Sequence, residues 1–331
     1  MRNPDSNFLI LLVLAAACVE PAESPMDGAG SAESTLPDDG FVEVRGSRLA
    51  YDVIGGGPGV PALFIHGGPG GTGCGFTLSL DSLSRTRPVI VYDQIGSGYS
   101  SRIPEDRRSD FTDFGRFLEE IDAIRDELNL AEVHLVGSSW GTAVALEYLL
   151  EGASDGVRSV SFVGPYFSTE RWLADTDALI ETLSESSRAA IAEAVASGEF
   201  DTPAFRAADQ EFASMYGIRT PRDQIDWGAC DIEPAGNSGM YEFMWGPSEF
   251  VSTGTLRDYD RISRLPEVQV PVLFVRGEYD EPSDATVAEF QSMIPGARYE
   301  TIPEAGHGVY IDEPEAFDAV IVEFLASVEG G

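Results

Sequence analysis

The chain has 331 residues, of which 56 are acidic and 21 basic, and its net charge is −35. A surface this acidic repels nucleic-acid phosphates and excludes a nucleic-acid partner. None of the basic residues is lysine, which excludes Schiff-base chemistry, lysine-bound pyridoxal phosphate and a P-loop.

The N-terminal segment resembles a targeting signal. The apolar run "FLILLVLAAA" is followed at once by Cys18, and ten residues are too few to cross a bilayer, which needs about 20. Residues 1–18 are therefore expected to be a lipoprotein-type signal with Cys18 as the lipidated residue, which would anchor an exported protein to the bacterial cell envelope, with the outer membrane favoured. The alternative is an ordinary secretory signal and a soluble secreted or periplasmic protein. Residues 19–40 are rich in Pro, Gly, Ser and acidic residues and are expected to be a flexible linker.

Regular secondary structure is predicted from residue 41 onward. Alternating apolar and polar residues around a glycine predict a β-hairpin over 41–55. Short apolar runs predict buried strands at 61–67, 88–94, 132–138 and 157–165. Apolar residues three and four apart predict a helix over 110–128, and a second helix is predicted over 142–150.

The alternation of strands and helices stops between residues 166 and 262. This stretch has helical patterns and no buried strand run, which predicts a mostly helical cap. Alternation resumes with a strand over 271–280, helices over 284–294 and 314–328, and a strand-like segment between them. The pattern predicts an α/β fold, with a mostly parallel sheet and helices on both faces built from residues 41–165 and 263–331.

A reactive serine is predicted where the strand 132–138 meets the next helix. The sequence "GSSWG" has Gly-x-Ser-x-Gly spacing only around Ser139, and this spacing after a strand and before a helix is typical of a nucleophile elbow. Ser138 is expected to end the strand.

The partners of this serine are expected beyond later strands. His307 lies in a glycine-flanked loop after the last strand, and Asp280 lies at the end of the strand predicted over 271–280, in "VLFVRGEYDEPS". His134 lies inside a strand and His66 before a glycine run, so both are expected to be structural. We predict a catalytic triad in which Ser139 attacks, His307 transfers the proton and Asp280 orients the imidazole.

The glycine run "HGGPGG" supplies a candidate oxyanion hole. It follows a strand at the position where the second amide donor of this kind of site is expected. The predicted donors are the backbone amides of Gly68 and Trp140.

The remaining cysteines, Cys74 and Cys230, lack C-x-x-C spacing, which argues against a zinc site. They can form a disulfide or remain separate buried thiols. Three scattered histidines offer no metal-ligand pattern, and we expect no metal or other cofactor.

Several motifs together resemble the proline iminopeptidase family of serine peptidases, especially its tricorn-interacting and amino-acid-amidase-like branch. In order they are "HGGPGG", "YDQIGSGYS", "GSSWG", "MWGPSEF", "GEYDE" and "AGH", spread over about residues 41–328. Family members usually have "GGSWG" in place of "GSSWG" and an arginine where this chain has Ile95.

The resemblance implies an α/β-hydrolase fold with a helical cap and removal of an N-terminal residue, often proline, from short peptides or amides. It also implies that Glu249 and Glu281 bind the substrate's amino group, because the family's amine-binding glutamates occupy these motif positions. Two alternatives are open: an esterase or amidase of the same fold acting on small acyl substrates, and a surface lipoprotein that uses the fold for binding only. The expected partner is a small peptide or amino-acid amide, and membrane contact is expected only through the lipid anchor.

Overall fold

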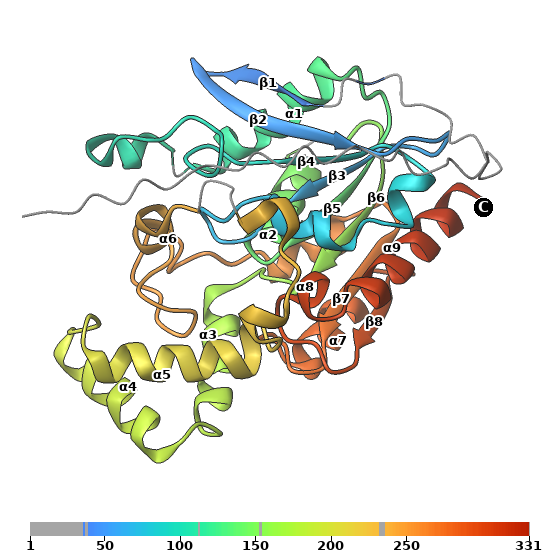
Figure 1. Cartoon of the computed structure of the whole chain (residues 1–331). Helices are drawn as coiled ribbons and strands as arrows, with labels where there is room; N and C mark the ends of the chain where they lie inside the picture. The colour runs from blue at the N-terminus through green and yellow to red at the C-terminus, as the bar shows by residue number, and fades with distance from the viewer. Residues whose placement is uncertain (1–35, 37–38, 112, 152–153, 232–235, 331) are drawn as a thin grey trace, which may run out of the picture. The chain divides into compact units, whose positions relative to one another are not determined.

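The computed structural model describes residues 36, 39–111, 113–151, 154–231 and 236–330. Within them, eight strands form one sheet in the order β1-β2-β4-β3-β5-β6-β7-β8 (Figure 1). The strands are β1 (Asp39–Val44), β2 (Ser47–Ile54), β3 (Ala62–Ile65), β4 (Val89–Tyr92), β5 (Val133–Ser138), β6 (Val157–Val163), β7 (Val272–Gly277) and β8 (Arg298–Ile302). The α-helices are α1 (Phe114–Glu127), α2 (Trp140–Leu150), α3 (Thr169–Ile180), α4 (Glu185–Ser197), α5 (Pro203–Phe212), α6 (Ser238–Met244), α7 (Asp284–Met293), α8 (Val309–Asp312) and α9 (Pro314–Glu329).

The sheet is antiparallel at one edge and parallel elsewhere. β1 and β2 form the predicted hairpin, β2 pairs antiparallel with β4, and all later neighbours are parallel. β3, β4 and β5 are buried along their whole length, as their continuous apolar runs predict. The predicted α/β-hydrolase fold is confirmed. In a parallel sheet all strands end at the same edge, so the loops after β3, β5, β7 and β8 can meet there.

Side chains that alternate along each strand build two cores. One face of the sheet packs against α1, α2 and α7, with Leu135 and Phe162 among its buried residues. The other packs against α9 and two short 3₁₀ helices, with Val136 and Val163 among its residues.

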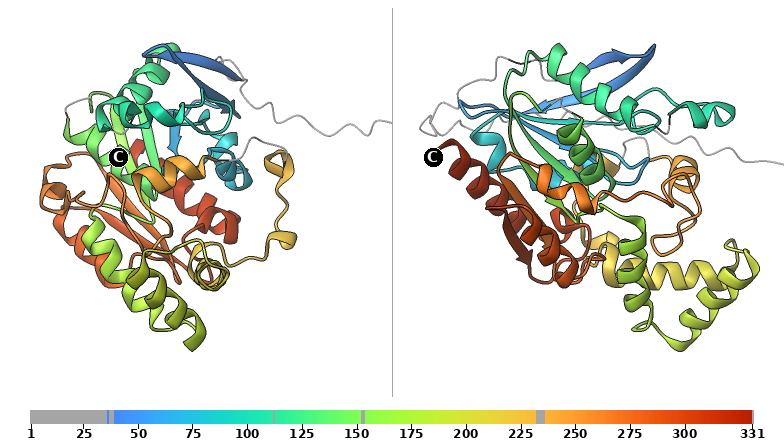
Figure 2. Two further views of the ribbon diagram at one scale, coloured as in Figure 1. Left: turned by 90° about the vertical axis from the view of Figure 1, so that its left-hand side faces the viewer. Right: turned by 180° about the vertical axis from the view of Figure 1, so that it is seen from behind.

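The segment between β6 and β7 is largely helical. α4 and α5 form a hairpin with an apolar cluster of its own, joined by Phe250 (Figure 2). Ser168, Ser184 and Thr202 each accept a hydrogen bond from a backbone N–H of the helix that follows, which fixes where α3, α4 and α5 begin. The described part of 166–262 contains only two isolated β-bridges and no strand.

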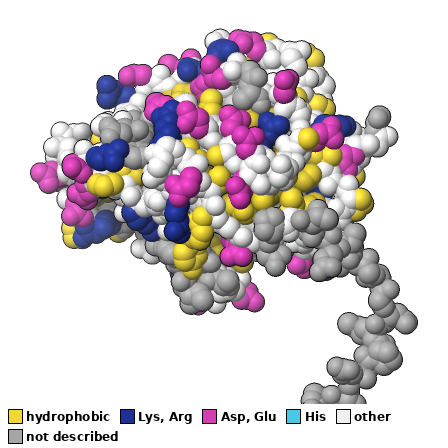
Figure 3. All heavy atoms as spheres, turned by 90° about the horizontal axis from the view of Figure 1, so that it is seen from above, with side chains coloured by type: hydrophobic (Ala, Val, Ile, Leu, Met, Phe, Trp, Pro, Cys, Tyr) yellow, Lys and Arg dark blue, Asp and Glu magenta, His cyan; other side chains and the backbone are white. Residues whose placement is uncertain are grey.

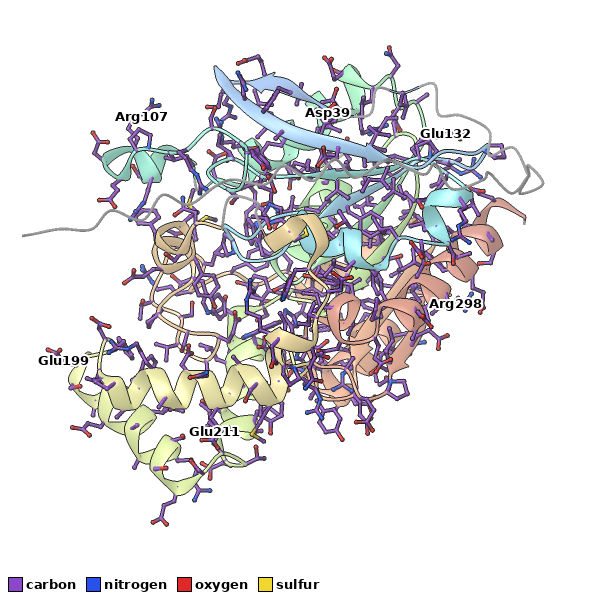
Figure 4. The ribbon with its side chains drawn as sticks, viewed as in Figure 1. Asp39, Arg107, Glu132, Glu199, Glu211 and Arg298 are labelled. Carbon is purple, nitrogen blue, oxygen red and sulfur yellow. A yellow bond between two sulfur atoms is a disulfide. The ribbon has the colours of Figure 1, made fainter. Side chains whose placement is uncertain are left out.

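Acidic and arginine side chains are interspersed over the face shown in Figure 3. Asp39, Glu132 and Glu199 are exposed and point outward (Figure 4). Across the described ranges, the structure contains no helix long and apolar enough to span a bilayer.

A disulfide joins Cys74 and Cys230, 156 positions apart in the sequence. Of the two possibilities that the sequence left open, the structure has the bonded pair. The bridge ties the 3₁₀ helix Cys74–Ser79, which lies within the β3–β4 connection, to the short helix Gly228–Asp231 of the cap segment.

Replacing both cysteines by serine is expected to lower the free energy of unfolding of the oxidised protein by about 2–4 kcal/mol, because a crosslink across a long loop restricts the unfolded chain. Urea denaturation with and without a thiol reductant measures this. The double variant should not respond to the reductant. If the double variant has the same denaturation midpoint as the unmodified protein with its disulfide intact, the bridge does not stabilise the fold.

Candidate active site

Ser139 lies at a sharp turn between β5 and α2. Its φ of 53° is unusual for a residue other than glycine, and such backbone strain is common at functional sites. A Cβ at Gly137 would lie 2.4 Å from the Gly141 carbonyl oxygen, and one at Gly141 would lie 2.0 Å from that of Ile65. Both flanking positions therefore require glycine. Ser138 is the buried last residue of β5.

Asp280 and His307 meet beyond the ends of β7 and β8. His307 Nδ1 and Asp280 Oδ1 are 2.6 Å apart. The carboxylate also accepts hydrogen bonds from the backbone N–H groups of Gly277 and Glu281, at 3.2 and 2.8 Å. A Cβ at Gly164 would lie 2.5 Å from His307 Cε1, so a glycine after β6 is needed to admit the imidazole.

The other ring nitrogen, His307 Nε2, has no hydrogen-bond partner among the described residues. Ser139 Oγ is therefore not hydrogen-bonded to it in this structure, whereas Glu281 Oε2 lies 4.0 Å away. Such contacts are often long without substrate and tighten when it binds. The fold thus brings Asp280 and His307 into direct contact and leaves Ser139 at the same edge of the sheet.

The glycine loop after β3 lies against the elbow. Gly68, which has a φ of 116°, and Trp140 line one pocket together with Ser139. Trp140 is the first residue of α2, and the first N–H groups of a helix have no partner within the helix. Both amides are therefore near the serine and suited to receive a developing negative charge.

Gln94, which the sequence analysis did not single out, connects the two halves of this site. Its side chain accepts a hydrogen bond from the Trp140 indole N–H at 2.9 Å and donates one to the His66 carbonyl at 2.7 Å. The Gln94 backbone N–H donates to His66 Nε2 at 2.9 Å. His66 and Gln94 are buried and hold the glycine loop to the elbow. The signal available in the sequence was the position of Gln94, two residues past the end of β4.

The pocket next to Ser139, here named the acyl pocket, is small and largely aromatic. It is lined by Gly68, Pro69, Ser139, Trp140, Tyr166, Trp172, Trp245, Glu249 and Leu256. Trp172 packs edge-on against His307, with ring centroids 5.3 Å apart, and its indole N–H donates to the Glu249 carbonyl oxygen at 3.1 Å. The cap thus supplies most of the apolar wall.

Two carboxylates lie beside the imidazole. Glu281 is 1% exposed, and its Oε2 accepts no hydrogen bond from the described residues. Burial raises the pKa of Glu281 well above its usual range, and the negative charges of Glu249, Asp280 and Asp209 raise it further, while His307 lowers it. Burial also raises the pKa of Glu249, opposed by His307 and the Tyr241 hydroxyl. Buried carboxylates that share a single imidazole favour a further cationic group in a ligand.

The same carboxylates control the protonation of His307. Burial by itself lowers the pKa of His307, but Glu281, Asp280 and Glu249 outweigh this effect and raise it to about 10. The three carboxylates therefore favour the protonated imidazole in the free enzyme.

A further carboxylate, Asp209, lies on α5. Burial and, to a smaller extent, the charge of Glu249 raise the pKa of Asp209 to about 6.

His134 is remote from this site and contacts Ser159 and Glu329 at 2.7 and 3.1 Å. Within the described ranges, no cluster of His, Cys, Asp or Glu is suited to hold a metal ion.

Comparison with known proteins places the chain in a family. Residues 62–320 match the model of the alpha/beta hydrolase family. The proline iminopeptidase of Heyndrickxia coagulans is 36% identical over 293 residues, which are 88% of this chain and 99% of that protein, and that of Levilactobacillus brevis is 33% identical over 87% of this chain and 96% of that protein. The crystal structure of proline iminopeptidase from Mycobacterium smegmatis superposes with a TM-score of 0.76 at 30% identity, over 88% of this chain and 98% of that one.

These relatives correct the localisation predicted from the N-terminal segment. Export with a lipid anchor, or secretion, was expected from the apolar run before Cys18. This prediction is wrong, because the proline iminopeptidases that the chain matches are typically soluble cytoplasmic enzymes. A ten-residue apolar run ending in small residues is a short pattern with little specificity. Cys18 itself lies outside the described residues.

The similarity between this chain and the proline iminopeptidases therefore covers nearly their full length as well as their fold. The chain belongs to the proline iminopeptidase family of α/β hydrolases.

Proposed function

We propose that the protein is a serine aminopeptidase that releases an N-terminal residue, with proline favoured, from short peptides or amino-acid amides through an acyl-enzyme. The observation that carries this proposal is the pair of buried carboxylates, Glu249 and Glu281, beside the Asp280–His307 pair. An esterase of the same fold has no need for two such charges.

The proposed reaction begins at Ser139. His307 removes the hydroxyl proton as the oxygen attacks the substrate carbonyl, and Asp280 stabilises the imidazolium that forms. The amides of Gly68 and Trp140 bind the oxyanion. His307 then gives its proton to the leaving amine as the C–N bond breaks, and water hydrolyses the acyl-enzyme by the same steps.

The two glutamates are proposed to bind the amino group of the substrate. Glu249 lines the acyl pocket, and Glu281 lies 4.0 Å from His307 Nε2, so both are placed near the reacting carbonyl. An ammonium ion there would pair with carboxylates that burial otherwise destabilises. The small size of the acyl pocket supports a single residue on this side of the bond.

The aromatic wall of the acyl pocket supports a preference for proline. Tyr166, Trp172 and Trp245 offer rigid apolar surfaces, and the three rings pack edge-on against one another. A compact five-membered ring can pack against such surfaces and has no freely rotating side chain to immobilise. The ring's own ammonium can also lie against the aromatic faces.

Amine binding and base strength are coupled in this arrangement. A bound ammonium neutralises Glu249 and Glu281, which removes the main cause of the raised pKa of His307. We therefore expect aminoacyl substrates to be hydrolysed near neutral pH, where the free imidazole is still protonated.

For an uncharged acetate ester, hydrolysis is expected to increase with pH, with its midpoint well above 6.5 and toward the His307 pKa of about 10. Glu281→Gln should move this midpoint down, because it removes a negative charge that favours the imidazolium. The pH profile of kcat/KM for p-nitrophenyl acetate measures both. A midpoint near the ordinary histidine value in the unmodified enzyme would contradict the coupling.

The function is tested with a panel of aminoacyl-β-naphthylamides carrying Pro, Ala, Leu or Glu, measured beside short-chain acyl esters. The proposal predicts the highest kcat/KM for the prolyl compound. Efficient ester hydrolysis without aminoacyl hydrolysis would instead identify an esterase.

A further inference from the structure

A second cavity, here named the outer cavity, adjoins the active site on the side of His307. Its volume is about 650 Å³, much larger than that of the acyl pocket. Glu249 lines both, whereas His307 and Glu281 line only the outer cavity. The two spaces therefore meet at Glu249, and Glu281 and His307 lie on the outer side of this junction.

The chemistry of amide hydrolysis assigns a role to each side. The histidine that takes the serine proton later donates it to the leaving amine, so the leaving group must lie against that imidazole. Since His307 faces the outer cavity, the part of the substrate that follows the scissile bond extends into it. The outer cavity is also the larger of the two, as a longer leaving part requires.

The wall of the outer cavity is fixed to the catalytic loop by main-chain hydrogen bonds. The N–H groups of His307 and Gly308 donate to the carbonyls of Tyr216 and Gly217, at 2.7 and 2.9 Å. Asp312 accepts hydrogen bonds from the backbone of Arg219 at 3.0 and 3.1 Å. A wall held in this way keeps its side chains in place before substrate arrives.

This wall presents apolar side chains and two arginines, Arg219 and Arg222, the second of which has its Cζ 4.5 Å from the centroid of the Trp227 ring. Ile218, which is 37% exposed, Ile225 and Trp227 line the cavity. The Arg219 guanidinium donates to the carbonyls of Glu304 and Met215, at 2.9 and 3.0 Å, and its Cζ lies 3.6 Å from the centroid of the Tyr279 ring.

Among the described residues, Arg219 is held in position by neutral groups only. No carboxylate of the described chain lies within ion-pair distance of its guanidinium, although the protein carries 56 acidic residues. A fixed arginine of this kind is suited to pair with a carboxylate supplied by a ligand. The active site thus has carboxylates for the substrate's amino end and an arginine in the cavity beyond.

We propose that the outer cavity binds the leaving part of the substrate, that it favours an apolar side chain after the scissile bond, and that Arg219 pairs with the free terminal carboxylate of a short peptide. This inference rests on the proposed aminopeptidase function and adds to it the substrate class: short peptides with a free carboxylate rather than long chains or amides.

The test compares prolyl-leucine and prolyl-leucyl-leucine, each as the free acid and as the C-terminal amide. In the unmodified enzyme, kcat/KM is expected to be about tenfold higher for the free acid than for the amide, either of the dipeptide or of the tripeptide. This is the effect expected of one charge-assisted contact. Prolyl-leucine is expected to exceed prolyl-serine by about five- to tenfold, because its side chain buries more apolar surface.

Arg219→Gln is expected to bring the acid-to-amide ratio close to one. The matched control is Arg206→Gln, which makes the same change in net charge at an exposed site on α5, where Arg206 is paired with Asp201; it should keep the ratio. Prolinamide, whose leaving group is only ammonia, reports whether the catalytic centre of each variant is intact.

These readouts separate the two proposals. If the unmodified enzyme does not hydrolyse prolinamide or any prolyl peptide, the proposed function fails. If the enzyme hydrolyses these substrates but shows no preference for the free acids at either length and none for leucine over serine, the assignment of the outer cavity is overturned. It is also overturned if the preference for the acids survives in Arg219→Gln. The comparison in the unmodified enzyme stands even if Arg219→Gln proves inactive.

Discussion

Ser139→Ala is expected to lower kcat for a prolyl substrate by about 10⁶-fold, the scale seen when the nucleophile of a serine hydrolase triad is removed. The turn that holds Ser139 is imposed by the glycines on either side and by its positive φ, so no neighbouring hydroxyl can take its place. Steady-state hydrolysis of L-prolyl-β-naphthylamide measures the loss. Labelling by a fluorophosphonate, which reacts with activated serines, should vanish in parallel.

Ser138→Ala is the matched control for this experiment. Ser138 is the adjacent residue in sequence and is buried at the end of β5. Its replacement should leave fluorophosphonate labelling and most of the activity in place. Labelling that persists in Ser139→Ala, or disappears in Ser138→Ala, would show that the nucleophile is misassigned.

Glu249→Gln and Glu281→Gln are each expected to lower kcat/KM for free-amine substrates by about 10- to 100-fold, the scale of one charge-assisted contact of about 1.5–3 kcal/mol. Each substitution keeps the shape of the side chain and removes its negative charge. The effect should appear with every aminoacyl substrate, because the amino group is common to all of them. kcat/KM for the prolyl and alanyl naphthylamides measures it.

Ester hydrolysis is the control for both glutamate variants. Measured above the midpoint of its pH profile, where His307 is neutral in all the proteins, hydrolysis of p-nitrophenyl acetate should change little. Equal losses of ester and aminoacyl hydrolysis would mean that the two glutamates support the structure of the site rather than bind the amine.

The elements that carry the proposed catalytic residues could be predicted from the sequence because their signals are local. The buried run before Ser139 and the helix after it were both predicted, and α2 begins at Trp140, two residues earlier than expected. Asp280 was placed beyond a strand from its neighbours in sequence alone. Parallel strands then bring such residues to one edge, whatever their distance along the chain.

The aromatic wall and the outer cavity could not be predicted in this way. Tyr166, Trp172 and Trp245 come from separate parts of the chain, and only the packing of the cap against the sheet brings them to one pocket. The contact of Arg219 with the catalytic loop depends on main-chain hydrogen bonds around residues 216 and 307, which leave no pattern in either sequence segment.

The structure also accounts for Ile95, where the family usually has arginine. Ile95 is 2% exposed, and its backbone N–H donates to the buried Glu120 carboxylate at 3.3 and 3.4 Å. Arg116 Nε on α1 lies 3.9 Å from the same carboxylate. Burial raises the pKa of Glu120 to about 8, although Arg116 opposes this. The basic side chain beside Glu120 is therefore Arg116 from α1. Ile95 is not among the residues that line the acyl pocket.

Recognition of a free amino group is the central feature of this account, and one pair of substrates tests it directly. L-Prolyl-β-naphthylamide and cyclopentanecarbonyl-β-naphthylamide have the same ring size and leaving group and differ in the ring ammonium. The buried Glu249 and Glu281 predict a kcat/KM at least about 100-fold higher for the prolyl compound. Equal values, or a preference for the cyclopentane compound, would contradict an aminopeptidase.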